Sequence, residues 1–172
     1  MRRSVFWIIP LFWLGQLATA DSRVLVWKLD QDLETAYTEI YKALEKNRFY
    51  VVFEPNIQRN LSGFAERWGE DYNRSGLENL RAMVFCNAWY ANKVSNLDPD
   101  MLGFCPLHIT LVERLQDGGA RTTVLFNRPT AMTAGSAAHE LLGRIEAEVI
   151  AAIEKGLAML ESGPAGKQAG TP

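Results

Sequence analysis

Two cysteines, a methionine and a histidine that lie close together are the residues of this chain best suited to chemistry. Cys86 and Cys105 are its two cysteines, and Met101 and His108 lie on either side of the second. Thiolate, thioether and imidazole groups together suit soft metals such as copper. Two cysteines in an oxidising compartment more often form a disulfide. The stretch from Leu80 to Leu111, which holds all four residues, is therefore where a site is expected.

Three kinds of site remain open on these residues. A Cys86–Cys105 disulfide would close a loop of about 20 residues and stabilise the fold by about 3 kcal/mol. A soft-metal or haem site would use Cys86, Met101, Cys105 and His108, although the lack of CxxCH excludes covalent c-type haem. A ligand pocket would use Cys86, Asn87 and Cys105, because strand-to-helix junctions expose free helix amides and pockets gather convergent polar groups.

Catalysis finds little support in the sequence. The two cysteines are not a CxxC pair, and there is no GxSxG, phosphate loop or HExxH. A nucleophilic pair of either cysteine with His108 lacks an identifiable third group to orient it. Glu113 and Asp98 have no clear carboxylate partner for acid–base work. We therefore assign no catalytic residue, expect a protein that is not an enzyme, and leave any cofactor unidentified.

The elements that position the cysteines follow from the local pattern. The apolar run from Leu80 to Phe85 predicts a buried strand. Asn87 is a suitable N-cap for a helix that continues to Leu97, and Asp98-Pro99 ends that helix because proline disfavours the helical region for the residue before it. The two cysteines flank this strand–helix–turn excursion, so its ends can return close to one another.

These motifs resemble those of a known family. Cys86-Asn87-Ala88, Asp98-Pro99, Gly103 and Cys105-Pro106 stand in the order seen in the DUF302 family, which has the TT1751-like fold. Its pattern is a strand ending in Cys-Asn-Pro, a short helix, Asp-Pro, a glycine, and Pro-Cys opening a strand. Here alanine replaces the first proline, and the second cysteine precedes its proline. The resemblance covers Val24 to Pro129 and implies a fold but little chemistry, since the family's function is poorly defined.

The N-terminal half predicts a strand–helix–strand unit. Val24–Trp27 is the first strand and Phe49–Phe53 the second. Between them lies an amphipathic helix, with Asp30 as its expected N-cap and Asn47 as its left-handed C-cap. The apolar residues of Ile57–Trp68 share one helical face, which predicts a further short amphipathic helix before a polar loop at 69–76.

The C-terminal half predicts a hairpin and a long helix. Leu107–Leu115 and Arg121–Asn127 flank the turn residues Asp117-Gly118-Gly119, and alternation along the first strand turns His108 away from the leucine face. Ser136 is the expected cap of the final helix. The order β-α-β-α-β-α-β-β-α predicts an α+β two-layer sandwich, with one mainly antiparallel sheet and the helices packed on one face.

The N-terminus has the layout of a secretory signal peptide. Arg2 and Arg3 precede the apolar stretch Val5–Leu17, and Ala18-Thr19-Ala20 offers a cleavage site. An uncleaved anchor is the alternative. We therefore expect a signal peptide at 1–20, a single domain at 21–161 and a disordered tail at 162–172, in a periplasmic or secreted protein without a membrane span after cleavage. A net charge of −2 gives no basic footprint for nucleic acid.

Together these features predict a small exported domain that binds a ligand or protein partner, neither identified, near Cys86 and Cys105. The alternative is a redox or soft-metal (copper or haem) handling protein that uses Cys86, Cys105 and His108. A cysteine-dependent enzyme ranks third. A homodimer is a further expectation, because an exposed sheet edge can pair with a second copy.

Overall fold

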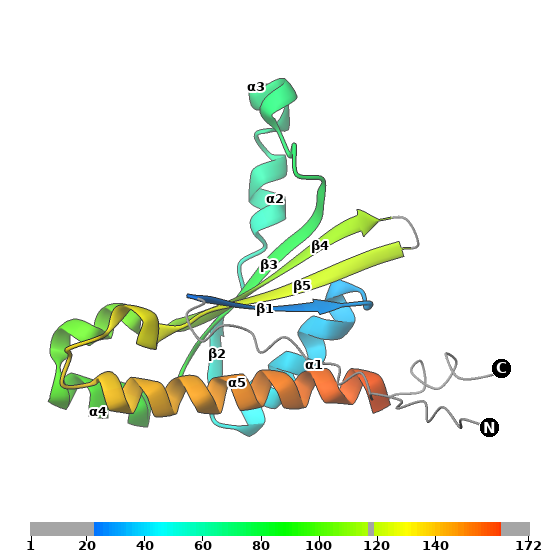
Figure 1. The fold of residues 1–172 in the computed structure, drawn as a ribbon. Coiled ribbons are helices and arrows are strands. Elements are labelled where there is room, and N and C mark those ends of the chain that lie inside the picture. The colour runs from blue at the N-terminus through cyan, green and yellow to red at the C-terminus, as the bar shows by residue number, and fades with distance from the viewer. Residues whose placement is uncertain (1–22, 117–118, 163–172) are drawn as a thin grey trace, which may run out of the picture.

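The computed structural model describes residues 23–116 and 119–162 (Figure 1). The predicted signal peptide and most of the tail lie outside these ranges, but Ser162, assigned to the tail from sequence, is the last residue of the final helix. No helix of the described residues has the length and apolar character needed to cross a membrane. The elements are β1 Val24–Leu29, α1 Leu33–Lys46, β2 Tyr50–Phe53, α2 Ile57–Ser62, α3 Ala65–Trp68, η1 Gly69–Asp71, β3 Leu77–Cys86, α4 Ala88–Leu97, η2 Pro99–Phe104, β4 Leu107–Gln116, β5 Gly119–Asn127, η3 Pro129–Met132 and α5 His139–Ser162.

One antiparallel sheet of five strands forms the first layer, in the order β1-β5-β4-β3-β2. The predicted hairpin is confirmed as β4 and β5, and it lies in the middle of the sheet. Side chains alternate along these strands, so Ile109 and Leu111 face one side while His108 faces the other and is exposed. The predicted orientation of His108 is therefore confirmed.

Helices α1 and α5 form the second layer and cover one face of the sheet (Figure 1). The two helices approach closely at Gly156, where an added Cβ would lie 2.9 Å from the backbone oxygen of Glu39. The predicted α+β class with helices on one face is confirmed. The buried core between the layers contains Leu33, Ile40, Leu44, Met83, Phe85, Ile109, Leu111, Val124, Phe126, Ile145, Val149 and Ile153.

Three local predictions for the N-terminal half were wrong. The N-cap of α1 is Asp32 rather than Asp30, because the Asp32 side chain accepts the Thr35 amide while Asp30 pairs with Arg121. Asn47 does end α1, but its φ is −95°, and the left-handed residue is Arg48 with a φ of 65°.

The third concerns the single amphipathic helix expected over Ile57–Trp68. The segment forms two short helices that break at Gly63 and Phe64, and neither buries a residue. The apolar face that the sequence pattern predicts is only partly buried: Leu61 is half-buried, while Phe64 and Trp68 remain 45% and 42% exposed.

The connection before α5 is tied by side chains. Ser136 lies three residues before the helix rather than at its start, where its Oγ accepts the Ala138 amide and donates to the Asp98 carboxylate at 2.6 Å. Asp98 itself ends α4. The end of α4 is therefore held against the start of α5, which fixes the position of the excursion between the cysteines.

Candidate functional site

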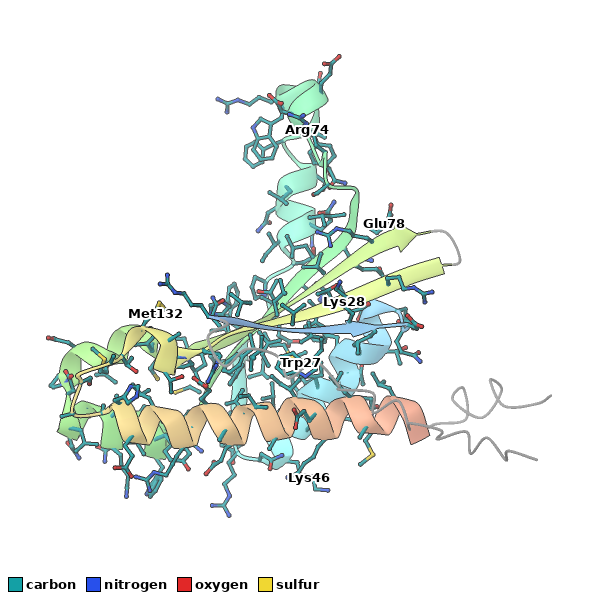
Figure 2. All side chains as sticks on the ribbon, viewed as in Figure 1. Trp27, Lys28, Lys46, Arg74, Glu78 and Met132 are labelled. Atoms are coloured by element: carbon teal, nitrogen blue, oxygen red, sulfur yellow. The ribbon has the colours of Figure 1, made fainter. Side chains whose placement is uncertain are left out.

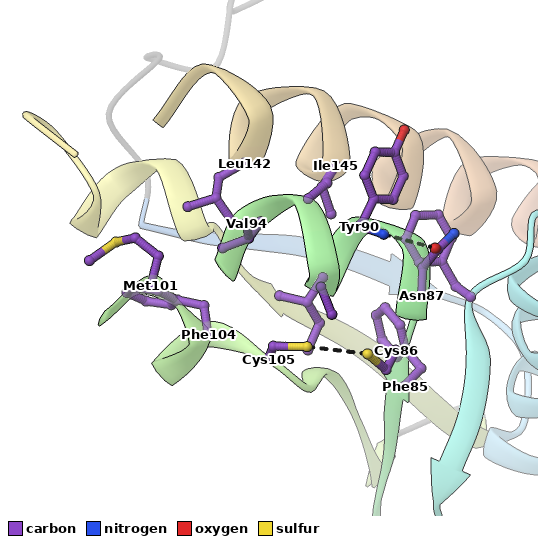
Figure 3. A pocket seen from close by; sticks show the side chains of 13 residues that line it. Phe85, Cys86, Asn87, Tyr90, Val94, Met101, Phe104, Cys105, Leu142 and Ile145 are labelled. Atoms are coloured by element: carbon purple, nitrogen blue, oxygen red, sulfur yellow. Dashed lines mark hydrogen bonds between the residues drawn. The ribbon is translucent and has the colours of Figure 1, made fainter. Parts of the chain in front are cut away.

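The two cysteines meet although they lie 19 positions apart in the sequence. Cys86 is the last residue of β3, and Cys105 follows η2 just before β4, which pairs with β3. Their Sγ atoms lie 3.2 Å apart (Figure 3). This is longer than the roughly 2.05 Å of a disulfide bond, and both cysteines are free thiols here. The expectation that the excursion returns on itself is confirmed.

A small apolar cavity of about 30 Å³ opens beside the sulfurs. It lies between α4, η2, the end of the sheet and α5, and Figure 3 shows Val94, Leu142 and Ile145 converging on it. A volume of this size holds one or two water molecules at most. Its walls are Phe49, Phe85, Cys86, Asn87, Tyr90, Ala91, Val94, Met101, Phe104, Cys105, Leu107, Leu142 and Ile145.

The thiols sit in an environment that keeps Cys105 protonated. Burial, together with the neighbouring Cys86 sulfur, raises the pKa of the Cys105 thiol to about 12. A thiol acts as a nucleophile or metal ligand through its thiolate, which is scarce at neutral pH when the pKa is so high. The reduced Cys105 is therefore a poor nucleophile.

Asn87 caps α4 as predicted. Its Oδ1 accepts hydrogen bonds from the amides of Trp89 and Tyr90, at 3.1 and 3.2 Å. These amides would otherwise be free to bind an anion. Because Asn87 already occupies them, this helix end is poorly prepared for an anionic ligand.

A wider hollow of about 500 Å³ lies on the other side of Asn87 and Tyr90, which line both spaces. Arg48, Tyr50 and Trp89 contribute exposed side chains to it. Glu148 completes the wall and accepts a hydrogen bond of 2.5 Å from the Tyr90 hydroxyl, which raises the pKa of Tyr90. The hollow is thus aromatic and polar, in contrast to the apolar cavity.

The predicted metal set also included Met101 and His108. Neither side chain lies beside the two cysteine sulfurs. Met101 lines the cavity, but in Figure 3 its sulfur lies well away from the Cys105 sulfur, beyond Phe104. His108 opens instead into a separate hollow beside Asn127 and Met132. Within the described ranges, no three His, Cys, Asp or Glu side chains gather in a way that could hold a metal ion.

Sequence reasoning missed the walls contributed by distant elements. Arg48, Tyr50 and Glu148 come from the α1–β2 connection, β2 and α5, and nothing in their local sequence links them to Cys86. Leu142 and Ile145 were recognisable as part of a buried helical stripe. Their place beside the cysteines follows only from the packing of α5 over α4.

The comparisons with known proteins identify the family. The model of the family described as "Domain of unknown function DUF302" matches residues 25–160. The chain belongs to the DUF302 family. This confirms the resemblance seen around the cysteines and extends it through α5. No curated protein matches this DUF302 chain.

A solved structure of the family supports the fold. The crystal structure of the uncharacterized conserved protein DUF302 from Bacillus stearothermophilus matches with a TM-score of 0.62 and 18% identity, covering 77% of this chain and 97% of that one. At this identity the similarity shows that the two proteins share a fold and says nothing of their ligands.

Proposed function

We propose that this DUF302 protein is an exported, non-catalytic binding protein whose site is the corner formed by Cys86, Asn87 and Cys105. One observation carries the proposal: the two sulfurs, 3.2 Å apart, line an apolar cavity that the fold leaves unfilled. Close packing is the norm in protein interiors, so an unfilled apolar space at a strand-to-helix junction is a candidate place for a ligand.

The walls indicate the kind of ligand. The cavity is apolar and small, so it accepts a methyl or ethyl group and not a charged one. The wider hollow beyond Asn87 and Tyr90 offers Arg48 and two exposed aromatic side chains, Tyr50 and Trp89, to a larger polar or aromatic portion. We infer an amphipathic ligand, or a partner side chain, that inserts its apolar end towards the sulfurs.

The state of Cys105 supports binding rather than catalysis. Its pKa of about 12 keeps the thiol protonated near neutral pH. His108 lines a different hollow and is not placed to remove the proton. Export rests on the basic start, apolar stretch and Ala18-Thr19-Ala20 site of the N-terminus. The mass of the mature protein tests it, because cleavage before Asp21 would remove residues 1–20.

Short alcohols from methanol to hexanol are suitable probes of the cavity. We expect saturable shifts of the methyl NMR signals of Val94, Leu107 and Ile145, with an affinity that rises from methanol to ethanol and then levels off, because the cavity holds no more than an ethyl group. Ala91→Leu, which fills the cavity from a half-buried position on α4, should abolish saturation. Leu97→Ala, at an exposed position of the same helix, should leave it unchanged. Shifts that never saturate, or that persist in Ala91→Leu, would rule out the site.

Redox exchange is the second candidate, and the sulfur separation favours it. Closing the pair would join the two sulfurs, release two protons and pass two electrons to a partner's disulfide, which becomes two thiols. Intact mass with and without reductant distinguishes the forms, since the disulfide form is about two daltons lighter. In glutathione buffers, a midpoint potential below about −300 mV would indicate a structural disulfide and exclude exchange.

The soft-metal alternative would rest on Cys86 and Cys105, with Met101 in the same cavity wall. Titration of the reduced protein with Cu(I) tests it, with Cys86→Ser and Cys105→Ser as single variants. Loss of stability in both variants without any loss of bound copper would reject this alternative.

A further inference from the structure

Arg48 occupies a position where the fold favours glycine. It directly follows Asn47, the C-cap of α1. Its amide donates to the Glu45 carbonyl oxygen at 2.9 Å, and the Phe49 amide donates to that of Leu44 at 3.0 Å. These two hydrogen bonds form a Schellman motif, in which the residue after the cap is left-handed and usually glycine. Arg48 adopts this conformation with a φ of 65°, which strains a residue that carries a Cβ. An arginine placed there at a cost in stability points to a use for its side chain.

The Arg48 guanidinium is available to a ligand. Arg48 lines the hollow of about 500 Å³ beside Asn87 and Tyr90, and its side chain is exposed. Lys46, the last residue of α1, points outward from the molecule (Figure 2), so the connection that follows it is open to solvent. No described residue forms a hydrogen bond or an ion pair with the Arg48 side chain. An arginine fork binds both oxygens of a carboxylate, or two oxygens of a phosphate, side by side.

The carboxylate in the wall of the hollow is already engaged. Glu148 accepts the hydrogen bond of 2.5 Å from the Tyr90 hydroxyl. This hydrogen bond raises the pKa of Tyr90, and the positive charge of Arg144 opposes the shift, so Arg144 lies near the same hydroxyl. Of the described residues that line the hollow, only Arg48 and Glu148 are charged. The cation is thus the one left without a partner, which favours an anionic ligand.

Aromatic rings form much of the remaining wall. Tyr50 on β2 and Trp89 on α4 are 54% and 58% exposed. Tyr90 is held in place, because its ring stacks on the buried Phe49 with centroids 6.3 Å apart and meets the Trp89 ring edge-on at 4.9 Å. The Lys93 Nζ lies 4.1 Å from the centre of the Trp89 ring and adds positive charge to this wall. Exposed rings of this kind suit a flat ring of a ligand, since ring pairs gain more than the area that they bury.

We propose that the ligand is an aromatic carboxylate, with its carboxylate on Arg48, its ring against Tyr50 and Trp89, and a short alkyl substituent in the cavity beside the sulfurs. The inference rests on the function proposed above, because the alkyl end enters that cavity. Asn87 lines both spaces, so one small ligand can span them. A carboxylate fits better than a phosphate, because Glu148 would repel the second charge of a phosphate.

Titration calorimetry with 4-alkylbenzoates tests the proposal. We expect the affinity to rise about fourfold with each carbon from benzoate to 4-ethylbenzoate. It should rise no further with 4-butylbenzoate, because the cavity holds no more than an ethyl group. The uncharged 4-ethylbenzamide should bind at least about tenfold more weakly than 4-ethylbenzoate. Equal binding of the amide, or tighter binding of phenyl phosphate than of benzoate, would overturn the proposal.

Substitutions at Arg48 separate a binding arginine from a structural one. Arg48→Gly relieves the left-handed strain, so Tm should rise by about 2–4 °C, while the affinity for benzoate falls at least about tenfold. Arg48→Gln should lose the same affinity without the gain in Tm. Arg67→Gln, at an exposed position on α3, is the matched control for a lost surface charge and should bind as wild type does. Undiminished binding of benzoate by Arg48→Gly would refute the role of Arg48.

Ala91→Leu distinguishes this inference from the function on which it rests. Filling the cavity should reduce the affinity for 4-ethylbenzoate to that for benzoate, whereas benzoate itself lies in the hollow and should bind unchanged. Saturable binding of alcohols without any binding of benzoates would leave the cavity proposal standing and overturn this one. Benzoate that binds through Arg48 while alcohols never saturate would instead overturn the cavity proposal and, with it, the place given to the alkyl group.

Discussion

Glu113 caps a helix that begins 80 residues before it. From the helix-covered face of β4, its Oε1 accepts a hydrogen bond of 2.9 Å from the backbone N–H of Leu33, at the start of α1. Its Oε2 accepts a second, of 2.5 Å, from the Asn79 side chain. A negative charge at a helix N-terminus is favourable, and here it also locks the helix layer to the sheet.

We expect Glu113→Ala to lower the free energy of unfolding by about 3 kcal/mol, because it leaves the Leu33 amide and the Asn79 side chain without their partner. Glu113→Gln keeps one acceptor and should cost less. Urea denaturation measures both. Glu78→Ala, at an exposed position on β3, is the control, and a cost equal to that of Glu113→Ala would contradict this assignment.

The contact between α1 and α5 gives a second prediction, from a matched pair of glycines. Gly156→Ala places a Cβ 2.9 Å from the Glu39 oxygen and the Ile40 Cα, both backbone atoms, and should cost about 1–3 kcal/mol. Gly143→Ala meets only the Thr130 methyl, at 3.6 Å, and should stabilise α5 by up to about 1 kcal/mol. Equal effects in thermal unfolding would show that the helices do not pack as closely as described.

Glu146 predicts a loss of stability in acid. Burial raises its pKa, but hydrogen bonds from Thr130 and Arg128 outweigh that effect and hold the pKa below the ordinary 4.5. A carboxyl with a lowered folded-state pKa stabilises the fold above its unfolded value, and this contribution is lost as the pH falls through the folded value. Below about pH 4.5, the stability of wild type should therefore fall faster than that of Glu146→Gln. Parallel curves of unfolding free energy against pH would contradict the prediction.

The fourth prediction concerns the reduced thiols. With a pKa of about 12, Cys105 should react with iodoacetamide at pH 8 about a thousand times more slowly than an ordinary cysteine. In Cys86→Ser, burial remains but the contribution of the Cys86 sulfur is lost, so the alkylation of Cys105 should begin at lower pH. Mass spectrometry after timed quenching follows both. Fast alkylation of Cys105 in folded wild type would show that the thiol is not held as described.

Local sequence signals predicted most elements of the fold. They did not predict which of two similar residues would cap a helix. Asp30 and Asp32 are both good caps, and only the position of Arg121 on β5, the strand beside β1, decides that Asp30 pairs there instead. The same limit applies to the Ile57–Trp68 segment. Its periodicity predicts an apolar face, but whether that face is buried depends on what lies near it in space.

The sequence predicted the part of the candidate site that two neighbouring strands form, namely the meeting of the two cysteines. Cys86 ends one strand and Cys105 precedes the next, so the antiparallel pairing of β3 with β4 brings them together. The opposite wall was not predictable, because Leu142 and Glu148 come from a helix whose placement depends on the whole core. The direction of His108 followed from simple alternation along β4.

The strand order also constrains how this chain can fold. The first two strands, β1 and β2, lie at opposite edges of the sheet, and the hairpin that joins the two halves is the last part of the sheet in the sequence. As the chain emerges from the ribosome, β1 has no partner until β5 has followed it. Such distant pairing slows folding, so the sheet of a nascent chain stays incomplete until β5 has been made, as far as Asn127. If the chain is exported, this delay keeps it in the unfolded form that can be threaded through a membrane channel.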